Sequence, residues 1–457
     1  MMDCIRTTYD GVTVAVEPIN IAAFDLWLKL QSECLENIAE HQKIGSKPGN
    51  FLLDYNEKGE LQKVYLVVAK DFNPYSIVEK INQLPAGYYH VETDDDALAS
   101  AVIRGWGFGN YRFERYLKPI DKPVLVVKNK NQFKTDLAVV AATYTVRDLI
   151  NTPADDMGPT ELAEWAEDFA EQHQMSFEQL VGDVLLSENF PTIHIVGRAS
   201  HKAPRIIELN WGQADNLPLI VLVGKGVCFD TGGNNMKPAE GMRWMKKDMG
   251  GGAHVLGLAQ LIISQKLPVR LKVLIPAVEN AVSGSAFRQG DVVTSRSGQT
   301  IEIGHTDAEG RVILADSLTY GCEFKPDLLI DFATLTGAAR IAMGPTVTPV
   351  FSNRDNLLDA IKESGIKTFD EMWPMPLPQR YKKYIKSTVA DMNNSASIPQ
   401  GGCITAGLFL QNFVDEDVDW VHIDTFGWNY GDRTGGTEGG EALGLAAVFD
   451  WLSDKYK

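Results

Sequence analysis

The feature that most constrains the fold is an alternation of apolar strands and helix-length segments from about residue 150 to the end of the 457-residue chain. Continuous apolar runs bury both faces of a strand, which is typical of parallel sheets with helices on both sides. The sequence therefore predicts an α/β fold with a central mixed, mainly parallel sheet flanked by helices. The predicted strands are 191–196, 205–211, 219–223, 269–277, 328–332 and 420–423, and the predicted helices are 251–265, 311–324, 404–413 and 441–452.

The first 140 or so residues have a different pattern, which predicts a smaller N-terminal α/β domain. Strand-like runs occupy 12–19, 63–70 and 122–128, and a helix-like stretch occupies 24–41. Three aspartates at 94–96 indicate a solvated loop or a helix start. Turn and cap residues are frequent at 147–160, and an amphipathic helix follows from Thr160 to His173. We therefore expect domains at 1–146 and 147–457.

Composition excludes several classes of protein. Five scattered cysteines without a C-x-x-C motif argue against a disulfide framework and a cysteine zinc site, so we expect a reducing cytoplasm. We see no secretory leader and no apolar run long enough to span a membrane. The net charge of -17 argues against non-specific binding to nucleic-acid phosphates. Neither a membrane nor a nucleic acid is an expected partner.

Residues with suggestive chemistry follow the predicted strands, where ligands bind in such sheets. Lys225, Asp230 and Lys237 come after the strand at 219–223. A lysine beside a divalent cation would have a lowered pKa and could act as a neutral amine ligand. Asp248 precedes a glycine run that opens a helix, so a role as helix N-cap is an equal alternative to ligation. The small residues at 333–338 suit close approach of the backbone to a ligand.

The segment H-T-D-A-E-G-R at 305–311 is the most informative for function. If it is extended, Asp307, Glu309 and Arg311 point to one face. Two such carboxylates repel each other unless a cation neutralises them, and a hard divalent metal is the natural candidate. The alternative is a solvated loop that carries this sequence by chance. The eight histidines are dispersed without an H-E-x-x-H motif, so a metal site here would be rich in carboxylates and suit Mn²⁺, Mg²⁺ or Zn²⁺.

Together, these segments resemble the leucine aminopeptidase (cytosol aminopeptidase) family of dinuclear metallo-exopeptidases. The resemblance covers roughly residues 147–457. It rests on N-T-P at 151–153, G-K-G-x-x-F-D-T-G-G at 224–233, Lys237, D-M-G-G at 248–251, the segment 279–293, T-D-A-E-G-R at 306–311 and the segment 333–337. It implies hydrolysis of the N-terminal residue of peptides by a water that two metals activate.

The resemblance also implies a role for each matching residue. The implied metal ligands are Lys225, Asp230, Asp248, Asp307 and Glu309, with Asp230 and Glu309 bridging both ions. Lys237 is implied as the catalytic electrophile, and Arg311 as the holder of a bicarbonate general base. The implied substrate-binding residues are Met245, Thr334, Leu335 and Gly337. His305 replaces the usual asparagine, and we expect it to contribute a titratable group or a bulkier donor beside the metals.

The implied cofactors are two divalent ions per subunit, Zn²⁺ or Mn²⁺, with Mg²⁺ and Co²⁺ as further candidates, and bicarbonate. A homohexamer is implied, with a non-catalytic N-terminal domain for oligomerisation or access control. One alternative is a dipeptidase of narrow specificity that uses the same site. Another, from a different class, is a regulatory nucleic-acid-binding relative.

Overall fold

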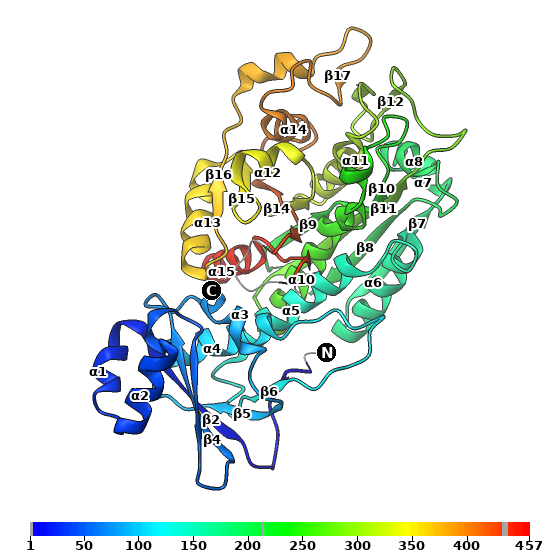
Figure 1. Cartoon of the computed structure of the whole chain (residues 1–457). Helices are drawn as coiled ribbons and strands as arrows, with labels where there is room; N and C mark the ends of the chain where they lie inside the picture. The colour runs from blue at the N-terminus through cyan, green and yellow to red at the C-terminus, as the bar shows by residue number, and fades with distance from the viewer. Residues whose placement is uncertain (1–2, 213, 215, 432–436) are drawn as a thin grey trace. The chain divides into compact units, whose positions relative to one another are not determined.

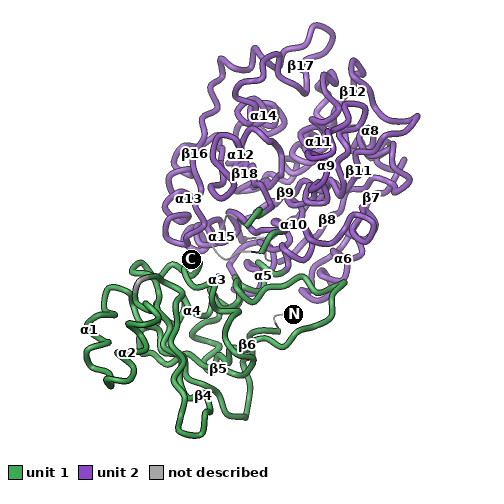
Figure 2. The backbone as a smooth tube through the Cα atoms, viewed as in Figure 1, with its two compact units in different colours: residues 1–144, 429–438 green, residues 145–428, 439–457 purple. Residues whose placement is uncertain are grey.

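The computed structural model describes residues 3–212, 214, 216–431 and 437–457 (Figure 1). The chain forms two compact units, residues 1–144 with 429–438 and residues 145–428 with 439–457 (Figure 2). The predicted boundary between residues 146 and 147 lies inside helix α5 (Lys134–Asn151). Among the described residues, no helix is long and apolar enough to cross a membrane.

The first unit contains a six-stranded sheet and several helices. Its elements are β1 (Ile5–Arg6), β2 (Val14–Asn20), α1 (Phe24–Leu28), α2 (Glu33–Gln42), β3 (Phe51–Tyr55), β4 (Leu61–Val68), α3 (Val78–Ile81), β5 (Gly87–Val91), α4 (Asp96–Gly109) and β6 (Pro123–Val126). The strand order is β1-β6-β5-β2-β4-β3. Only β3 and β4 pair antiparallel in this sheet, so an α/β unit forms as predicted.

The second unit is built on a nine-stranded mixed sheet. Its strands are β7 (Ser176–Val181), β8 (Arg205–Trp211), β9 (Leu219–Gly224), β10 (Gly226–Asp230), β11 (Arg270–Asn280), β14 (Leu328–Ala333), β15 (Thr348–Ser352), β16 (Met372–Pro374) and β18 (Trp420–Asp424). They run in the order β16-β15-β18-β14-β9-β11-β8-β7, with β10 beside β11. The central strands β18, β14, β9 and β11 are all parallel, which confirms the predicted fold class.

Helices cover both faces of this sheet. The helices of this unit after α5 are α6 (Pro159–His173), α7 (Val184–Ser187), α8 (Pro191–Gly197), α9 (Ala239–Met242), α10 (Gly250–Gln265), α11 (Glu309–Glu323), α12 (Gly337–Met343), α13 (Asp355–Thr368), α14 (Gly402–Gln411) and α15 (Leu445–Lys455). Leu274 lies next to Gly321 of α11, and the adjacent Ile275 lies next to Gly252 of α10. Because neighbouring residues of a strand point to opposite faces, α10 and α11 cover opposite sides.

The remaining elements are short. They comprise β12 (Val292–Thr294), β13 (Thr300–Glu302), β17 (Met392–Asn393), β19 (Trp428–Asn429), β20 (Gly439–Gly440) and the 3-10 helices η1 (Ile21–Ala23), η2 (Ile44–Ser46), η3 (Pro74–Ser76), η4 (Met245–Met249) and η5 (Gln379–Ile385). Strands β12, β13 and β17 form a small separate sheet.

Three predictions of local structure need correction. The apolar run at 191–196 is helix α8 rather than a strand, because Pro191 suits the first helical position and short apolar runs do not distinguish the two structures. The stretch 24–41 is divided into α1 and α2, with Ser32 capping the second helix. The last helix begins at Leu445 instead of residue 441, since Gly444 has a φ of 85° that a helix cannot include. Asp95 caps α4, so the aspartate run does mark a helix start.

Candidate metal centre

Four segments of the second unit bring the five predicted ligands to the carboxyl end of the central strands. Lys225 directly follows β9 and Asp230 ends β10. Asp248 lies in η4, Asp307 lies in the turn before α11, and Glu309 is the first residue of that helix. Parallel strands that are joined by helices have their carboxyl ends and the helix starts at one edge of the sheet, where ligands bind.

Two lysines lie between two pairs of carboxylates. Lys225 Nζ lies 2.8 Å from Asp248 Oδ2 and 3.0 Å from Glu309 Oε1. Lys237 Nζ lies 2.8 Å from Asp230 Oδ2 and 2.5 Å from Asp307 Oδ1. Carboxylate oxygens of Asp230, Asp307 and Glu309 also lie within 4.8 Å of one another. The structure therefore brings the five predicted ligands together, with Lys237 among them.

Burial and like charge perturb the cluster strongly. Burial, followed by the nearby Asp230 carboxylate, raises the pKa of Glu309 to about 8 and that of Asp307 to about 6. Burial works to lower the pKa of Lys225, but Asp248 and Glu309 outweigh it, so this pKa lies above its ordinary value. The pKa of Lys237 is raised in the same way, against the effect of burial, mainly by Asp230 and Glu309. The carboxylates thus need positive charge to remain ionised together.

The donor set fits divalent cations. Asp248 Oδ2 and Glu309 Oε1 are buried and accept no well-directed hydrogen bond from the described residues, although each lies near the Lys225 ammonium. Buried polar atoms are rarely left without partners. Hard cations such as Mg²⁺ and Mn²⁺ prefer carboxylate oxygens, and Zn²⁺ accepts them as well as nitrogen. These side chains could therefore serve as ligands of such ions.

Hydrogen bonds and close packing hold the predicted ligands in place. Asp230 Oδ1 accepts hydrogen bonds from Gly232 N and from Asn280 Nδ2, both at 2.8 Å. The same Asn280 amide donates to Thr306 O at 3.1 Å, which ties β10 to the turn that carries Asp307. Gly310 makes room for Lys225, because a Cβ there would lie 2.5 Å from the lysine Cε. The glycine of the D-A-E-G-R motif therefore has a steric role.

The segment 305–311 converges on the site for a different reason from the predicted one. It is not extended: a turn leads to Ala308, and α11 begins at Glu309. Arg311 does not join the carboxylates. Its Nη1 donates to Asn394 O at 2.8 Å, and its side chain lines a cavity of about 340 Å³ with residues 395–399, Gly402 and Thr405. Burial lowers the pKa of Arg311 to about 10.

Asp248 is not the cap of α10. Met249 occupies that position and caps without its side chain. The Asp248 carboxylate instead accepts a hydrogen bond from Thr334 Oγ1 at 2.7 Å and faces Lys225. Lys225 and Lys247, against the effect of burial, hold its pKa below the ordinary value. The alternative explanation of Asp248 as a purely structural cap is therefore wrong.

The residues predicted to bind the substrate lie in η4 and in the segment from β14 to α12. Thr334 O accepts a hydrogen bond from Lys225 Nζ at 3.1 Å. Leu335 follows it in the loop after β14, and Gly337 begins α12 with open space where a side chain would be. Met245 is half-buried at the start of η4, three residues before Asp248.

His305 lies beside Asp307, one of the five predicted metal ligands. Its Nδ1 accepts a hydrogen bond from Asp307 N at 3.2 Å, and its backbone is bonded on both sides to the Asn394 side chain. Burial, followed by the charges of Lys237 and Arg311, lowers the pKa of the imidazole. The ring therefore accepts a backbone hydrogen bond next to the cluster.

Sequence reasoning missed three residues: Asn280, Asn394 and Asp424, the last of which accepts hydrogen bonds from Leu335 N and Thr336 N. Asn280 and Asp424 end the apolar strands β11 and β18, so the strand-end argument that found Asp230 applies to them equally. Asn394 follows the two-residue strand β17 and has no comparable signal in the sequence.

Comparisons with known proteins agree with the resemblance. The model of the cytosol aminopeptidase family catalytic domain matches residues 144–449, and that of the M17 aminopeptidase N-terminal domain matches residues 14–125. A probable cytosol aminopeptidase of Syntrophotalea carbinolica is 40% identical over 78% of this chain and 74% of its own length. One of Persephonella marina is 37% identical over 74% of this chain and 72% of its own length.

Solved structures match over nearly the whole chain. The crystal structure of cytosol aminopeptidase from Coxiella burnetii has a TM-score of 0.94 and 41% identity, with complete coverage of both chains. The bottromycin maturation enzyme BotP in complex with Mn has a TM-score of 0.89 and 27% identity, and covers 98% of this chain and 100% of its own.

Proposed function

Because this chain belongs to the M17 cytosol aminopeptidase family of metal-dependent peptidases, we propose that it releases the N-terminal residue of peptides by a two-metal mechanism. The observation that carries the proposal is the cluster of four buried or half-buried carboxylates and two lysines at the strand ends. Such a charge arrangement is costly to bury without cations, so it is not explained by folding alone.

Five side chains would hold the metals: Lys225, Asp230, Asp248, Asp307 and Glu309. When bound, two divalent ions would activate a water as nucleophile and polarise the scissile carbonyl. The four carboxylates carry a charge of -4, which two divalent ions would balance if metal binding displaces the proton that these carboxylates otherwise keep on Lys225. Zn²⁺ and Mn²⁺ are the leading candidates, with Mg²⁺ and Co²⁺ as alternatives; the manganese named for the BotP complex supports Mn²⁺.

Lys237 is proposed to stabilise the oxyanion of the tetrahedral intermediate. Burial works to lower its pKa, but Asp230 and Glu309 outweigh burial and keep the ammonium charged. The ammonium lies directly beside Asp230 and Asp307. A fixed positive charge in a largely buried site favours negative charge that develops during the reaction. Lys237 is thus a catalytic residue that need not gain or lose a proton.

Arg311 is proposed to hold a bicarbonate, an ion whose chemistry is that of a general base. A guanidinium is a planar fork that suits bidentate binding of such an anion. Its buried Nε has no hydrogen-bond partner among the described residues, and the cavity of about 340 Å³ beside it has room for a small anion. Met245, Thr334 and Gly337 are proposed to contact the first side chain of the substrate, and the Leu335 carbonyl the intermediate.

Other proposals follow from the family rather than from the geometry. We propose a homohexamer in the cytoplasm, with the N-terminal domain serving assembly or access to the site. Light scattering that gives a monomer at micromolar concentration would refute the hexamer.

Profiling a library of dipeptides, longer peptides and aminoacyl amides with added Mn²⁺, Zn²⁺ or Mg²⁺ tests the function. We expect release of single N-terminal residues from peptides of several lengths. Cleavage of dipeptides alone would favour the narrow dipeptidase. Absence of any cleavage, with tight and sequence-specific DNA binding in a gel shift, would favour the regulatory alternative.

A further inference from the structure

We propose that Asp424 is a positioning residue for this reaction, which orients the loop after β14 so that its carbonyls face the metal centre. The inference rests on the proposed aminopeptidase function. It assigns to Asp424 no contact with the substrate or with a metal. Its action is on the backbone of Leu335 and Thr336.

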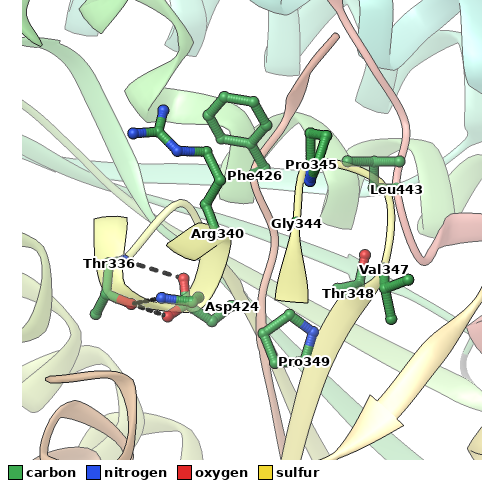
Figure 3. Close-up of a pocket in the computed structure, with 11 residues that line it drawn as sticks. Thr336, Arg340, Gly344, Pro345, Val347, Thr348, Pro349, Asp424, Phe426 and Leu443 are labelled. Atoms are coloured by element: carbon green, nitrogen blue, oxygen red, sulfur yellow. Dashed lines mark hydrogen bonds between the residues drawn. The ribbon is translucent and has the colours of Figure 1, made fainter. Parts of the chain in front are cut away.

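One buried carboxylate holds the whole loop. Asp424 ends β18, is 2% exposed and pairs in register with Ala333 of β14. Its Oδ1 accepts hydrogen bonds from Leu335 N and Thr336 N, both at 3.0 Å. Its Oδ2 accepts one from Thr336 Oγ1 at 2.6 Å (Figure 3). Three donors from two consecutive residues thus converge on this side chain.

The geometry of the peptide bond means that these contacts set the direction of the preceding carbonyl groups. In a trans peptide, the N–H and the preceding C=O point in opposite directions, and the described residues contain no cis peptide bond. The N–H of Leu335 points to Asp424, so the C=O of Thr334 points away from it and accepts the hydrogen bond from Lys225 Nζ at 3.1 Å. A single peptide group therefore connects Asp424 to a proposed metal ligand.

The next peptide group is held in the same way. Because the Thr336 N–H also points to Asp424, the C=O of Leu335 is directed to the opposite side. This carbonyl is the one proposed to contact the tetrahedral intermediate. Asp424 therefore sets the direction of both carbonyl dipoles of the loop, and a misdirected group near the reacting atoms can cost about 10²-fold in rate.

The hydrogen bond between the side chains of Thr336 and Asp424 extends the effect to α12. Thr336 Oγ1 donates to Asp424 and accepts from Ala339 N at 3.0 Å, which makes Thr336 the cap of this helix. Gly337, proposed to contact the substrate, is the first residue of the helix. Arg340 lies with its guanidinium 5.0 Å from the Phe426 ring, a second link between α12 and the segment after β18 (Figure 3).

Variants of Asp424 test the proposal in the full-length, metal-loaded protein. We expect Asp424→Ala to lower kcat/KM for leucyl amides about 10²-fold, mostly through kcat, with the metal content retained. Asp424→Asn should keep most of the activity, because the amide oxygen can still accept both backbone N–H groups. Thr336→Val keeps those two backbone hydrogen bonds but loses the side-chain hydrogen bond to Asp424, so it should have an intermediate effect.

Asp370 offers a matched control. It is also a carboxylate with 2% exposure, and it accepts hydrogen bonds from Gly444 N and Ala446 N at the start of α15. We expect Asp370→Ala to lower the thermal stability as Asp424→Ala does, but to leave kcat/KM within about twofold. The comparison separates the loss of a buried carboxylate from the loss of loop orientation.

Two readouts do not depend on turnover. The affinity for the aminophosphonate analogue of leucine, which mimics the tetrahedral intermediate, should fall in parallel with kcat/KM in Asp424→Ala, whereas the affinity for leucine should change little. Hydrogen exchange of the amides of Leu335 and Thr336 should speed up in Asp424→Ala and stay slow in Asp424→Asn. The exchange measurement works in the metal-free protein as well.

Several results would overturn the proposal. One is an Asp424→Ala variant whose kcat/KM and affinity for the analogue equal those of the wild type. Another is a loss of activity in Asp424→Ala that is explained by a loss of bound metal. A third is an equal loss of activity in Asp370→Ala. If Asp424→Ala does not fold, Asp424→Ser should show the same losses of kcat/KM and of affinity for the analogue. Full activity in Asp424→Ser would count equally against the proposal. A wild-type protein without peptidase activity would refute the proposed function instead, while the exchange rates would still report on the orientation of the loop.

Discussion

The side chain of His254 predicts a specific dependence of stability on pH. It is fully buried on α10 and stacked on Phe332. Leu443 N donates to its Nε2 at 3.1 Å, so the proton of the neutral ring lies on Nδ1, which donates to Gly250 O at 2.6 Å. Burial lowers the pKa of the imidazole to about 4. Protonation of Nε2 would also break the hydrogen bond from Leu443 N, because the two N–H groups would then point at each other.

The magnitude follows from the difference between the folded and unfolded pKa values. The folded pKa is below the ordinary value of about 6.5, so the contribution is fully present above pH 6.5 and is lost as the pH falls toward 4. A pKa of about 4 gives a loss of about 2 kcal/mol in the free energy of unfolding between pH 7.5 and pH 5.0. At pH 7.5, His254→Gln should be less stable than the wild type, and this difference should shrink by about 2 kcal/mol at pH 5.0.

Urea unfolding of the second unit, followed by tryptophan fluorescence at each pH, measures this difference. Asp307 and Asp316, both with a pKa raised to about 6 by burial, also titrate in the range, so only the difference between variants is diagnostic. His201, whose side chain is exposed, gives the control variant His201→Gln, which should follow the wild type at every pH. A difference between His254→Gln and wild type that stays constant from pH 7.5 to 5.0 would refute the reasoning.

Three further predictions concern the proposed metal centre. Lys237→Ala should lower kcat/KM for aminoacyl amides about 10³-fold, and activity close to wild type after metal reloading would contradict its catalytic role. His305→Asn should retain the affinity for Mn²⁺, because its amide oxygen can still accept the Asp307 N–H, whereas His305→Ala should bind Mn²⁺ more weakly in calorimetry; equal affinities would remove His305 from the site. Mn²⁺ at 100 times its dissociation constant should raise the free energy of unfolding by about 2.7 kcal/mol per site, and a chelator should reverse this increase. An unfolding midpoint in urea that does not change with Mn²⁺ would argue against specific binding.

The sequence predicted the parallel core of the second unit well, because most residues of its strands are apolar. Strands β9, β14 and β18 each extend one residue beyond the predicted end, and β11 begins one residue and ends three residues later than predicted. The antiparallel strand β8 matches its predicted bounds. Errors arose where an apolar run was short, as in α8, or where one residue with positive φ decided a boundary, as Gly444 did for α15. Such local decisions depend on tertiary contacts that the pattern of a single segment does not contain.

The candidate site shows the same division. Strand-end reasoning found Asp230 and Lys225, and the family resemblance supplied the remaining roles. The spacing of residues 305–311 predicts convergence through an extended segment, but Asp307 and Glu309 lie at the junction of a turn and a helix. Asn394 was missed because its contacts with His305 and Arg311 join segments more than 80 residues apart. Only the folded chain reveals that kind of support.

Metal stoichiometry tests the central proposal most directly. Protein stripped with a chelator would be titrated with Mn²⁺ in a calorimeter, and the release of N-terminal leucine from peptides measured on the same samples. We expect two ions per chain in the wild type, one in Asp307→Ala, and peptidase activity only where both are bound. Fewer than two ions in the wild type, or two ions bound with unchanged affinity and full activity in Asp307→Ala, would contradict a dinuclear aminopeptidase centre.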